Sequence, residues 1–215
     1  MGNICVQYDC GVPRLTCTDC GSCSSIMGKS LCGIENRGCC HYFPEFTLAD
    51  IQRMVHFTGG LKALKTILGN PGTVINSYNI YAKGYFDQNS YNSYIEAGDL
   101  LETGSLRDHT KFFRTCPFVE PSYGCILSPC FRTVVCNFFI CSEIMENPEH
   151  QYEFKPYIEE RSRYSRWIYR ESSELQHLLA EQGISLTSNF DMALKLLAEI
   201  PLNNYEFPEL TPVEY

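Results

Sequence analysis

The chain has 215 residues and 13 cysteines, and the cysteines fall into two groups. Eight lie within residues 1–46 and five within residues 116–141, while residues 41–115 and 142–215 contain none. Thiolates are soft ligands that suit zinc, copper(I) and iron–sulfur clusters. The two groups are therefore predicted to bind metal.

A disulfide scaffold is the main alternative for so many cysteines, and idle buried thiols are another. Disulfide-rich chains are typically short and secreted, and they lack a sufficient core. This chain is 44% hydrophobic, has 13 Phe and 14 Tyr, and carries an odd number of cysteines. Residues 1–6 lack the basic segment and apolar run of a secretory signal. We therefore expect a cytoplasmic protein with reduced or metal-bound thiols.

Charge and hydropathy limit the partners. The net charge of −8 argues against a nucleic-acid partner bound mainly through its phosphates. Four arginines fall in residues 161–170, but the glutamates around them favour a solvated face with ion pairs. No run of 18 apolar residues occurs, so no membrane span is expected.

The first group contains three cysteines at intervals of three, Cys17, Cys20 and Cys23. This spacing lets one turning loop present three sulfurs to one cluster, with a fourth cysteine from elsewhere. Zinc sites more often take four ligands from two paired units. The adjacent Cys39 and Cys40 suit different iron atoms or different sites. The first group thus favours a 4Fe-4S cluster, with zinc as the alternative.

The second group contributes Cys116, Cys125, Cys136 and Cys141 as candidate ligands. Thirteen cysteines exceed the needs of one four-thiolate site. Either two sites exist, or one buried site takes ligands from both groups, so we expect one or two clusters. Arg132, four residues before Cys136, is suited to stabilise the negative charge of a cluster, and a surface arginine is the alternative.

The expected fold is small and α+β, in one domain over residues 1–215. It is mostly helical, with irregular cysteine-rich loops organised by metal in 1–46 and 116–141. Thr47–Asp50 predicts a capping box, and the helix after it ends at Gly59 and Gly60. A β-hairpin is expected to turn at Pro121–Gly124 between extended segments 112–120 and 125–135. Within the C-terminal helices of 150–200, one starts at Pro156 and another is capped near Asn189.

These motifs resemble a known family. Cys17-x2-Cys20-x2-Cys23, then Cys39-Cys40 and the segment 43–54, is similar to the CxxCxxCC start of the YkgJ-type cysteine-cluster proteins. Cys116-Pro117-Phe118, Gly124-Cys125 and Arg132-x3-Cys136 resemble its second half. The chain departs from the pattern in the 15 residues between Cys23 and Cys39. The family is described as zinc- or iron-chelating and includes flagellin lysine N-methylases, so the resemblance implies metal binding rather than a particular reaction.

Two functional interpretations follow. The first is an iron–sulfur protein in electron transfer, or a component of a redox enzyme, with a redox protein partner or a small-molecule substrate. The second is a zinc-binding structural or interaction module, or a methyltransferase-like protein related to flagellin lysine N-methylase. His41, next to Cys39 and Cys40, is suited to ligate metal or to donate to a cluster sulfur, with a structural role as the alternative. No Walker loop, GxGxxG or GxSxG motif indicates a reaction.

Overall fold

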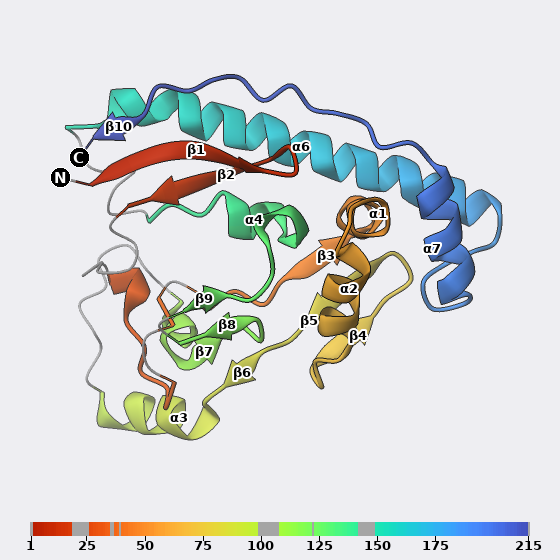
Figure 1. Ribbon diagram of the computed structural model, residues 1–215. Helices are drawn as coiled ribbons and strands as arrows, with labels where there is room; N and C mark the ends of the chain where they lie inside the picture. Colours follow the sequence, from red (N-terminus) through yellow and green to blue (C-terminus); the bar gives the residue numbers. More distant parts are fainter. Residues whose placement is uncertain are drawn as a thin grey trace.

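The computed structural model describes residues 2–18, 26–34, 37–38, 40–98, 108–121, 123–141 and 149–214. In these residues, α-helices combine with small antiparallel sheets in a small α+β fold (Figure 1). The long helix α6 lies along one side, above the strands β1 and β2, and the segments around the second cysteine group lie below them (Figure 1). No helix in the described part of the chain is long and apolar enough to cross a membrane.

The N-terminal region contains a β-hairpin, so the expectation of irregular structure over residues 1–46 is wrong for residues 3–17. Strand β1 (Asn3–Asp9) pairs antiparallel with β2 (Val12–Cys17) and, on its other edge, with β10 (Val213–Glu214). Cys10 and Gly11 both have positive φ, as a two-residue hairpin turn requires. In β1, Ile4 is fully buried, and it packs with α6 residues such as Phe154.

The predicted capping box is confirmed. Helix α1 (Leu48–His56) begins with Thr47, whose hydroxyl accepts from the Asp50 backbone N–H while the Asp50 carboxylate accepts from the Thr47 backbone N–H. Helix α2 (Gly60–Leu68) follows after a turn in which Gly59 has φ 86°. Ile51 and Met54 are fully buried. Helix α1 therefore lies at the centre of the main core, with α6 and α7 packed on it.

The tyrosine-rich stretch after α2 forms short strands and a helix. Strands β3 (Glu45–Thr47), β5 (Asn79–Ala82) and β4 (Thr73–Ile75) make a sheet in that order, and β6 (Tyr85–Phe86) pairs with β7 (Arg114–Thr115). In α3 (Gln88–Ala97), the rings of Tyr91 and Tyr94 both pack on Phe113 of the 3-10 helix η2 (His109–Phe113). These two tyrosines therefore attach α3 to the core.

The second cysteine group contains the predicted hairpin, in which β8 (Val119–Glu120) pairs with β9 (Gly124–Cys125). The prediction of extended chain over 125–135 is wrong beyond β9. A 3-10 helix η3 (Pro129–Phe131) and a short helix α4 (Val134–Asn137) follow, because Ser128 and Thr133 each cap a new turn with their hydroxyls. This folding turns Cys136 back toward the hairpin.

Two helices form the C-terminal part. Helix α6 (Gln151–Glu181) begins five residues earlier than Pro156, so this proline lies inside the helix instead of starting it. Helix α7 (Phe190–Glu199) begins as predicted with an Asn189 cap, whose side chain accepts from the Met192 N–H. Leu179 and Leu197 are fully buried between these helices and α1.

Gly84, between β5 and β6, lies where no side chain fits. A Cβ there would be 2.1 Å from the Thr115 carbonyl oxygen and 2.9 Å from Cδ of Pro117, on either side of Cys116. We expect Gly84→Ala to destabilise the fold by about 2 kcal/mol or more through overpacking, measured by urea denaturation. Gly33→Ala is the control, since its added Cβ meets no atom within 4 Å. Equal shifts in the two variants would contradict the prediction.

Candidate metal centre

Four cysteines form a group that we call the four-thiol cluster: Cys40, Cys116, Cys125 and Cys136. The charges of Cys136, Cys40 and Cys125 each raise the pKa of Cys116, and Cys125 and Cys40 also raise the pKa of Cys136. Such mutual effects require that the ionisable groups lie close together. Four predicted ligands from separate segments thus lie near enough to affect one another's charge, although no three of them converge as ligands of one ion among the described residues.

Backbone contacts position these four cysteines. The Cys116 N–H donates to the Cys40 carbonyl at 2.9 Å, which joins the two cysteine groups directly. The β8–β9 pairing places Cys125 opposite Val119. Thr133 then caps α4, and its hydroxyl donates to the Cys136 Sγ at 3.3 Å. These contacts fix the backbone segments that carry the cysteines, and the Cys136 sulfur also accepts a side-chain hydrogen bond, from Thr133.

Burial dominates the electrostatics of the cluster. It raises the pKa of Cys116 far above its usual range and raises that of Cys136 to about 11. Without a nearby cation, these buried thiols stay protonated at neutral pH. A bound metal removes this penalty, because its positive charge stabilises the thiolates. The donor set and its burial therefore fit a thiolate-ligated metal.

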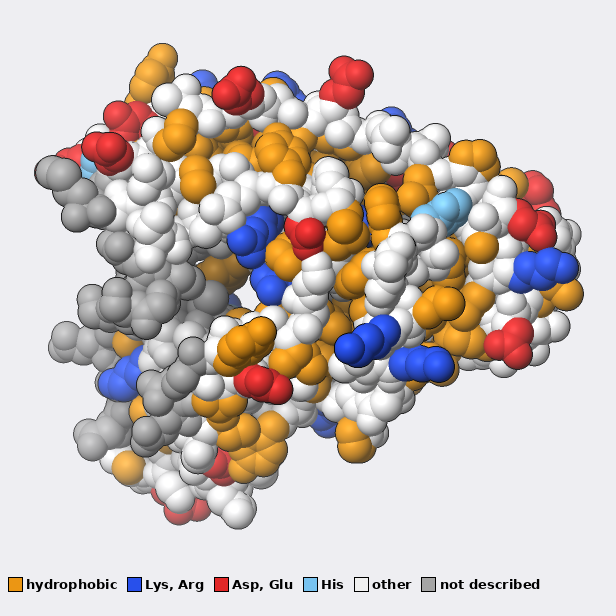
Figure 2. All heavy atoms as spheres, in the orientation of Figure 1, with side chains coloured by type: hydrophobic (Ala, Val, Ile, Leu, Met, Phe, Trp, Pro, Cys, Tyr) orange, Lys and Arg blue, Asp and Glu red, His pale blue; other side chains and the backbone are white. Residues whose placement is uncertain are grey.

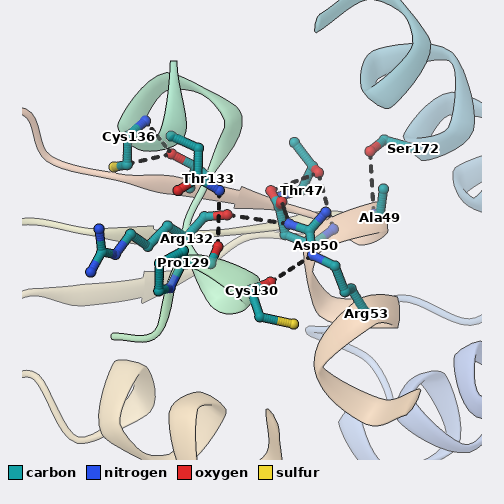
Figure 3. Close-up of polar contacts among 11 residues, drawn as sticks. Thr47, Ala49, Asp50, Arg53, Pro129, Cys130, Arg132, Thr133, Cys136 and Ser172 are labelled. Atoms are coloured by element: carbon teal, nitrogen blue, oxygen red, sulfur yellow. Dashed lines mark hydrogen bonds and ion pairs between the residues drawn. The ribbon is translucent and has the colours of Figure 1, made fainter. Parts of the chain in front are cut away.

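Arg132 lies beside the cluster. Its Nε donates to the Leu127 carbonyl at 2.8 Å, and its charge lowers the pKa of both Cys125 and Cys136 against the larger effect of burial. Figure 3 shows the side chains of Arg132 and Cys136 extending to the same side, away from Arg53. This position suits the predicted role of Arg132 as a counter-charge to a negative cluster.

His41, next to Cys40, has a buried ring with one nitrogen that lacks a hydrogen-bond partner among the described residues. That nitrogen is Nδ1, and the ring packs edge-on against Phe139. Burial, with a contribution from the Arg37 charge, lowers the pKa of His41 to about 4, so the imidazole is neutral at pH 7. Buried polar atoms are normally paired. A neutral ring with one unpaired nitrogen is able to ligate a metal or to make a further hydrogen bond, as the sequence analysis expects of His41.

Two other predicted ligands, Cys17 and Cys141, lie apart from this cluster. Cys17, at the end of β2, packs against the apolar cluster that includes Ile4 and Ile140, and the buried Cys141 follows Ile140 directly. Cys20, Cys23 and Cys39 lie outside the described residues. The described members of the predicted set thus occupy two locations.

Sequence reasoning gave little weight to two groups near the cluster. Cys32 is buried, and its sulfur is 3.3 Å from the Thr115 hydroxyl, beside Cys116. Burial raises its pKa, but hydrogen bonds from Ser30 and Thr115 outweigh burial and leave the pKa lowered. Thr133 is the second of these groups. Thr133 lies three residues before Cys136 and directly before two apolar residues. A threonine at such a position is a sequence signal for the N-cap of a helix.

A groove lies next to α4, between this helix and α6. It has a volume of about 580 Å³ and is lined by apolar residues such as Val134 and Phe138 together with Arg161 and Arg166. Figure 2 shows one face of the molecule, with Lys and Arg side chains among hydrophobic ones near its middle. The groove therefore combines an apolar wall with positive charge close to the helix that carries Cys136.

Asp9 anchors the loop that leads to Arg132. Its Oδ2 accepts hydrogen bonds from the Ser128 hydroxyl and, at 3.0 Å, from the Cys130 N–H. The Ser128 hydrogen bond is the main cause that holds the pKa of Asp9 below 3.8. A carboxyl with a depressed folded-state pKa stabilises the fold above its unfolded pKa and loses this contribution as pH falls through the folded value.

We therefore expect the wild-type protein to lose stability below about pH 4 more steeply than Asp9→Asn does. Urea denaturation at pH 5 and pH 3 measures this. Ser128→Ala, which removes the hydroxyl that donates to Asp9, should flatten the pH profile in the same direction. Parallel pH profiles for the wild type and Asp9→Asn would contradict the anchoring role.

Among the described residues, no three His, Cys, Asp or Glu side chains already converge as ligands of a single ion. The four-thiol cluster is thus defined by the mutual charge effects of its members, of which Cys116 is buried and the other three are partly buried. Comparison with protein-family models, with curated proteins and with solved structures finds no match to this chain. The resemblance to the YkgJ-type family is therefore a hypothesis that rests on the cysteine motifs alone.

Proposed function

We propose that the protein is an iron–sulfur protein and that the four-thiol cluster ligates one 4Fe-4S cluster. The observation that supports this proposal is the mutual influence of Cys40, Cys116, Cys125 and Cys136, which come from separate segments and are buried or partly buried. Four cysteine thiolates are the usual ligand set of such a cluster. Bound there, the cluster would supply one-electron chemistry.

The surrounding residues support a redox role. Arg132 places positive charge beside Cys125, and Thr133 donates a hydrogen bond to Cys136. Both interactions stabilise negative charge on the sulfurs, and hydrogen bonds and net charge are what tune cluster potentials. These residues would stabilise the more negative, reduced state and so raise the reduction potential of the cluster.

A second 4Fe-4S cluster is proposed for Cys17, Cys20 and Cys23, with Cys141 as fourth ligand. The spacing of the first three supports this assignment. So does the location of Cys17 and Ile140, which pack in the same apolar cluster although they are far apart in sequence. Two clusters would let electrons enter at one and leave at the other.

The groove beside α4 is the place proposed for a redox protein partner or a small-molecule substrate. Its basic residues Arg161 and Arg166 favour a ligand or surface that carries negative charge, and its apolar wall favours a hydrophobic part. Its position next to the helix of Cys136 would bring such a ligand near the proposed cluster.

Structural zinc is the second candidate, as in a binding module or a protein related to flagellin lysine N-methylase. The observation that favours it is the number of thiols, since four cysteines also complete a tetrahedral zinc site. In that case the cysteines would serve the fold, and the groove would be the recognition surface.

Metal analysis distinguishes the two candidates. The protein is purified without oxygen, and iron, acid-labile sulfide and zinc are counted per chain along with the visible spectrum. About four irons and four sulfides per chain would support one cluster, and about eight of each would support two, in both cases with absorption at about 400 nm. About one or two zincs without sulfide would support the structural site. A protein without either metal would contradict both.

A further inference from the structure

A pocket lies where the segment after α7 meets α1 and α6. Figure 1 shows this segment running along α6 on its way to β10. The pocket is lined by both helices, by residues 202–205 of the segment and by the turn after β1, and no described residue of its lining belongs to the four-thiol cluster. Its volume is about 100 Å³. Since a cavity of roughly 150 Å³ holds benzene, the pocket fits a group of about four or five non-hydrogen atoms.

Three aromatic side chains line the pocket and contact one another: Tyr164 and Trp167 of α6, and Tyr205 of the segment after α7. The ring centroid of Trp167 lies 5.6 Å from that of Tyr164 and 5.3 Å from that of Tyr205. The two tyrosine rings are nearly perpendicular, with an interplanar angle of 83°. The three rings therefore form a corner instead of a flat stack. Sites that bind quaternary ammonium ions are built from such sets of aromatic rings.

The least exposed charges beside these rings are carboxylates. Glu171 lines the pocket, and its side chain is 13% exposed. The Tyr205 hydroxyl donates to Glu160, whose side chain is 5% exposed. The cations that pair with these glutamates, Arg170 and Arg163, are 65% and 60% exposed, so water screens their charge. The local field in the pocket therefore favours a cation.

Several polar side chains of the lining already have partners. Arg53 lies 2.6 Å from the Asp50 carboxylate, which offsets its charge. The Glu171 Oε2 accepts a hydrogen bond from the Asn203 side chain at 2.6 Å. The Gln52 Nε2 donates to the Ile200 carbonyl at 3.0 Å. A cation that needs no hydrogen bonds therefore fits better than one with N–H donors of its own.

We propose that this pocket binds a trimethylammonium group through its aromatic rings and the negative charge of Glu171. Such a group has four non-hydrogen atoms and a positive charge without hydrogen-bond donors, so it matches the volume, the rings and the field. The exposed Cys10 and Asn204 belong to the lining, so the rest of the ligand can extend to the surface. The group belongs either to a soluble compound such as choline or to a phosphatidylcholine headgroup.

Fluorescence tests the proposal, because Trp167 is the only tryptophan in the chain and lines the pocket. The metal-containing protein is titrated with choline and, separately, with the uncharged analogue in which carbon replaces the nitrogen. We expect choline to change the tryptophan emission and to saturate by about 10 mM, as a site of about millimolar affinity requires. The analogue has the same shape and should bind at least about tenfold more weakly, because it lacks the charge. Equal affinities, or no response to choline, would overturn the proposal.

Two pairs of variants identify the site, with affinities measured by calorimetry. Glu171→Gln keeps the size of the side chain and should raise the Kd for choline about threefold or more. Its control is Glu174→Gln, since Glu174 is 60% exposed and pairs with the same Arg170. Tyr205→Ala should raise the Kd by about 3–30-fold, whereas Tyr152→Ala, at an 88% exposed position of α6, should leave it unchanged. Wild-type affinity in both Glu171→Gln and Tyr205→Ala would overturn the assignment.

Vesicles of phosphatidylcholine distinguish the two sources of the group. Co-sedimentation of the wild type, but not of Tyr205→Ala, would identify a lipid headgroup, and choline binding without co-sedimentation would identify a soluble compound. Binding in this pocket does not require the proposed iron–sulfur cluster. Absence of metal from the purified protein therefore bears only on that cluster, and absence of choline binding bears only on the pocket.

Discussion

Replacing Cys125 with serine should remove most of the metal from the purified protein. Mutating a residue that only contacts a metal ligand typically lowers the metal affinity about 10–100-fold. Loss of a direct ligand should therefore lower the metal affinity at least about tenfold. Cys116→Ser should behave in the same way, since both thiols belong to the four-thiol cluster. Iron, sulfide and zinc per chain, measured after identical purification, give the result.

The matched control for this experiment is Cys5→Ser, in β1, which the proposed centre does not include. It should retain the wild-type metal content. Ordering of the loops depends on the bound metal in such proteins, so Cys125→Ser should also melt at a lower temperature. Wild-type metal content in Cys125→Ser, or the same loss in Cys5→Ser, would contradict the assignment.

Replacing Arg53 with methionine should destabilise the fold by about 3–5 kcal/mol, because it leaves the Asp50 carboxylate buried without its partner. The Arg53 Nη2 lies 2.6 Å from the Asp50 Oδ1, and the two side chains are 9% and 2% exposed. Arg53 also donates to the carbonyls of Cys130 and Arg132. It thereby ties α1 to the loop between β9 and α4 (Figure 3).

Urea denaturation measures this effect, with Arg170→Met as the control. Arg170 forms ion pairs on the exposed face of α6, which contribute about 0–1 kcal/mol. The double variant Asp50→Asn with Arg53→Met should recover part of the loss, since no buried charge remains. Similar stabilities for Arg53→Met and Arg170→Met would show that the buried pair is unimportant.

Local signals in the sequence were sufficient for several elements. The Thr47 capping box, the turn before Gly124 and the Asn189 cap each depend on residues within four positions, and the structure confirms all three. The β1–β2 hairpin was missed because its alternation is short, its turn contains an unusual Cys10, and its outer partner β10 lies at the other end of the sequence.

The sequence predicted which cysteines are candidate ligands, but it did not predict which of them lie near one another. Their types indicated metal, but their grouping depends on long-range contacts such as the Cys116–Cys40 hydrogen bond. Spacing alone did not show that Cys17 lies in a different apolar cluster from Cys116. Three-dimensional packing decides which thiols meet, and a single sequence does not record it.

The pairing of β1 with β10 has a consequence for synthesis on the ribosome. The Tyr157 hydroxyl lies 3.3 Å from the Ile4 carbonyl and 2.8 Å from the Thr211 carbonyl, so one side chain of α6 holds both segments. The outer edge of β1 is made early but gains its partner only after residue 214 has been added. Until then its backbone groups are open to wrong pairing, and a nascent chain halted before β10 would be prone to aggregate.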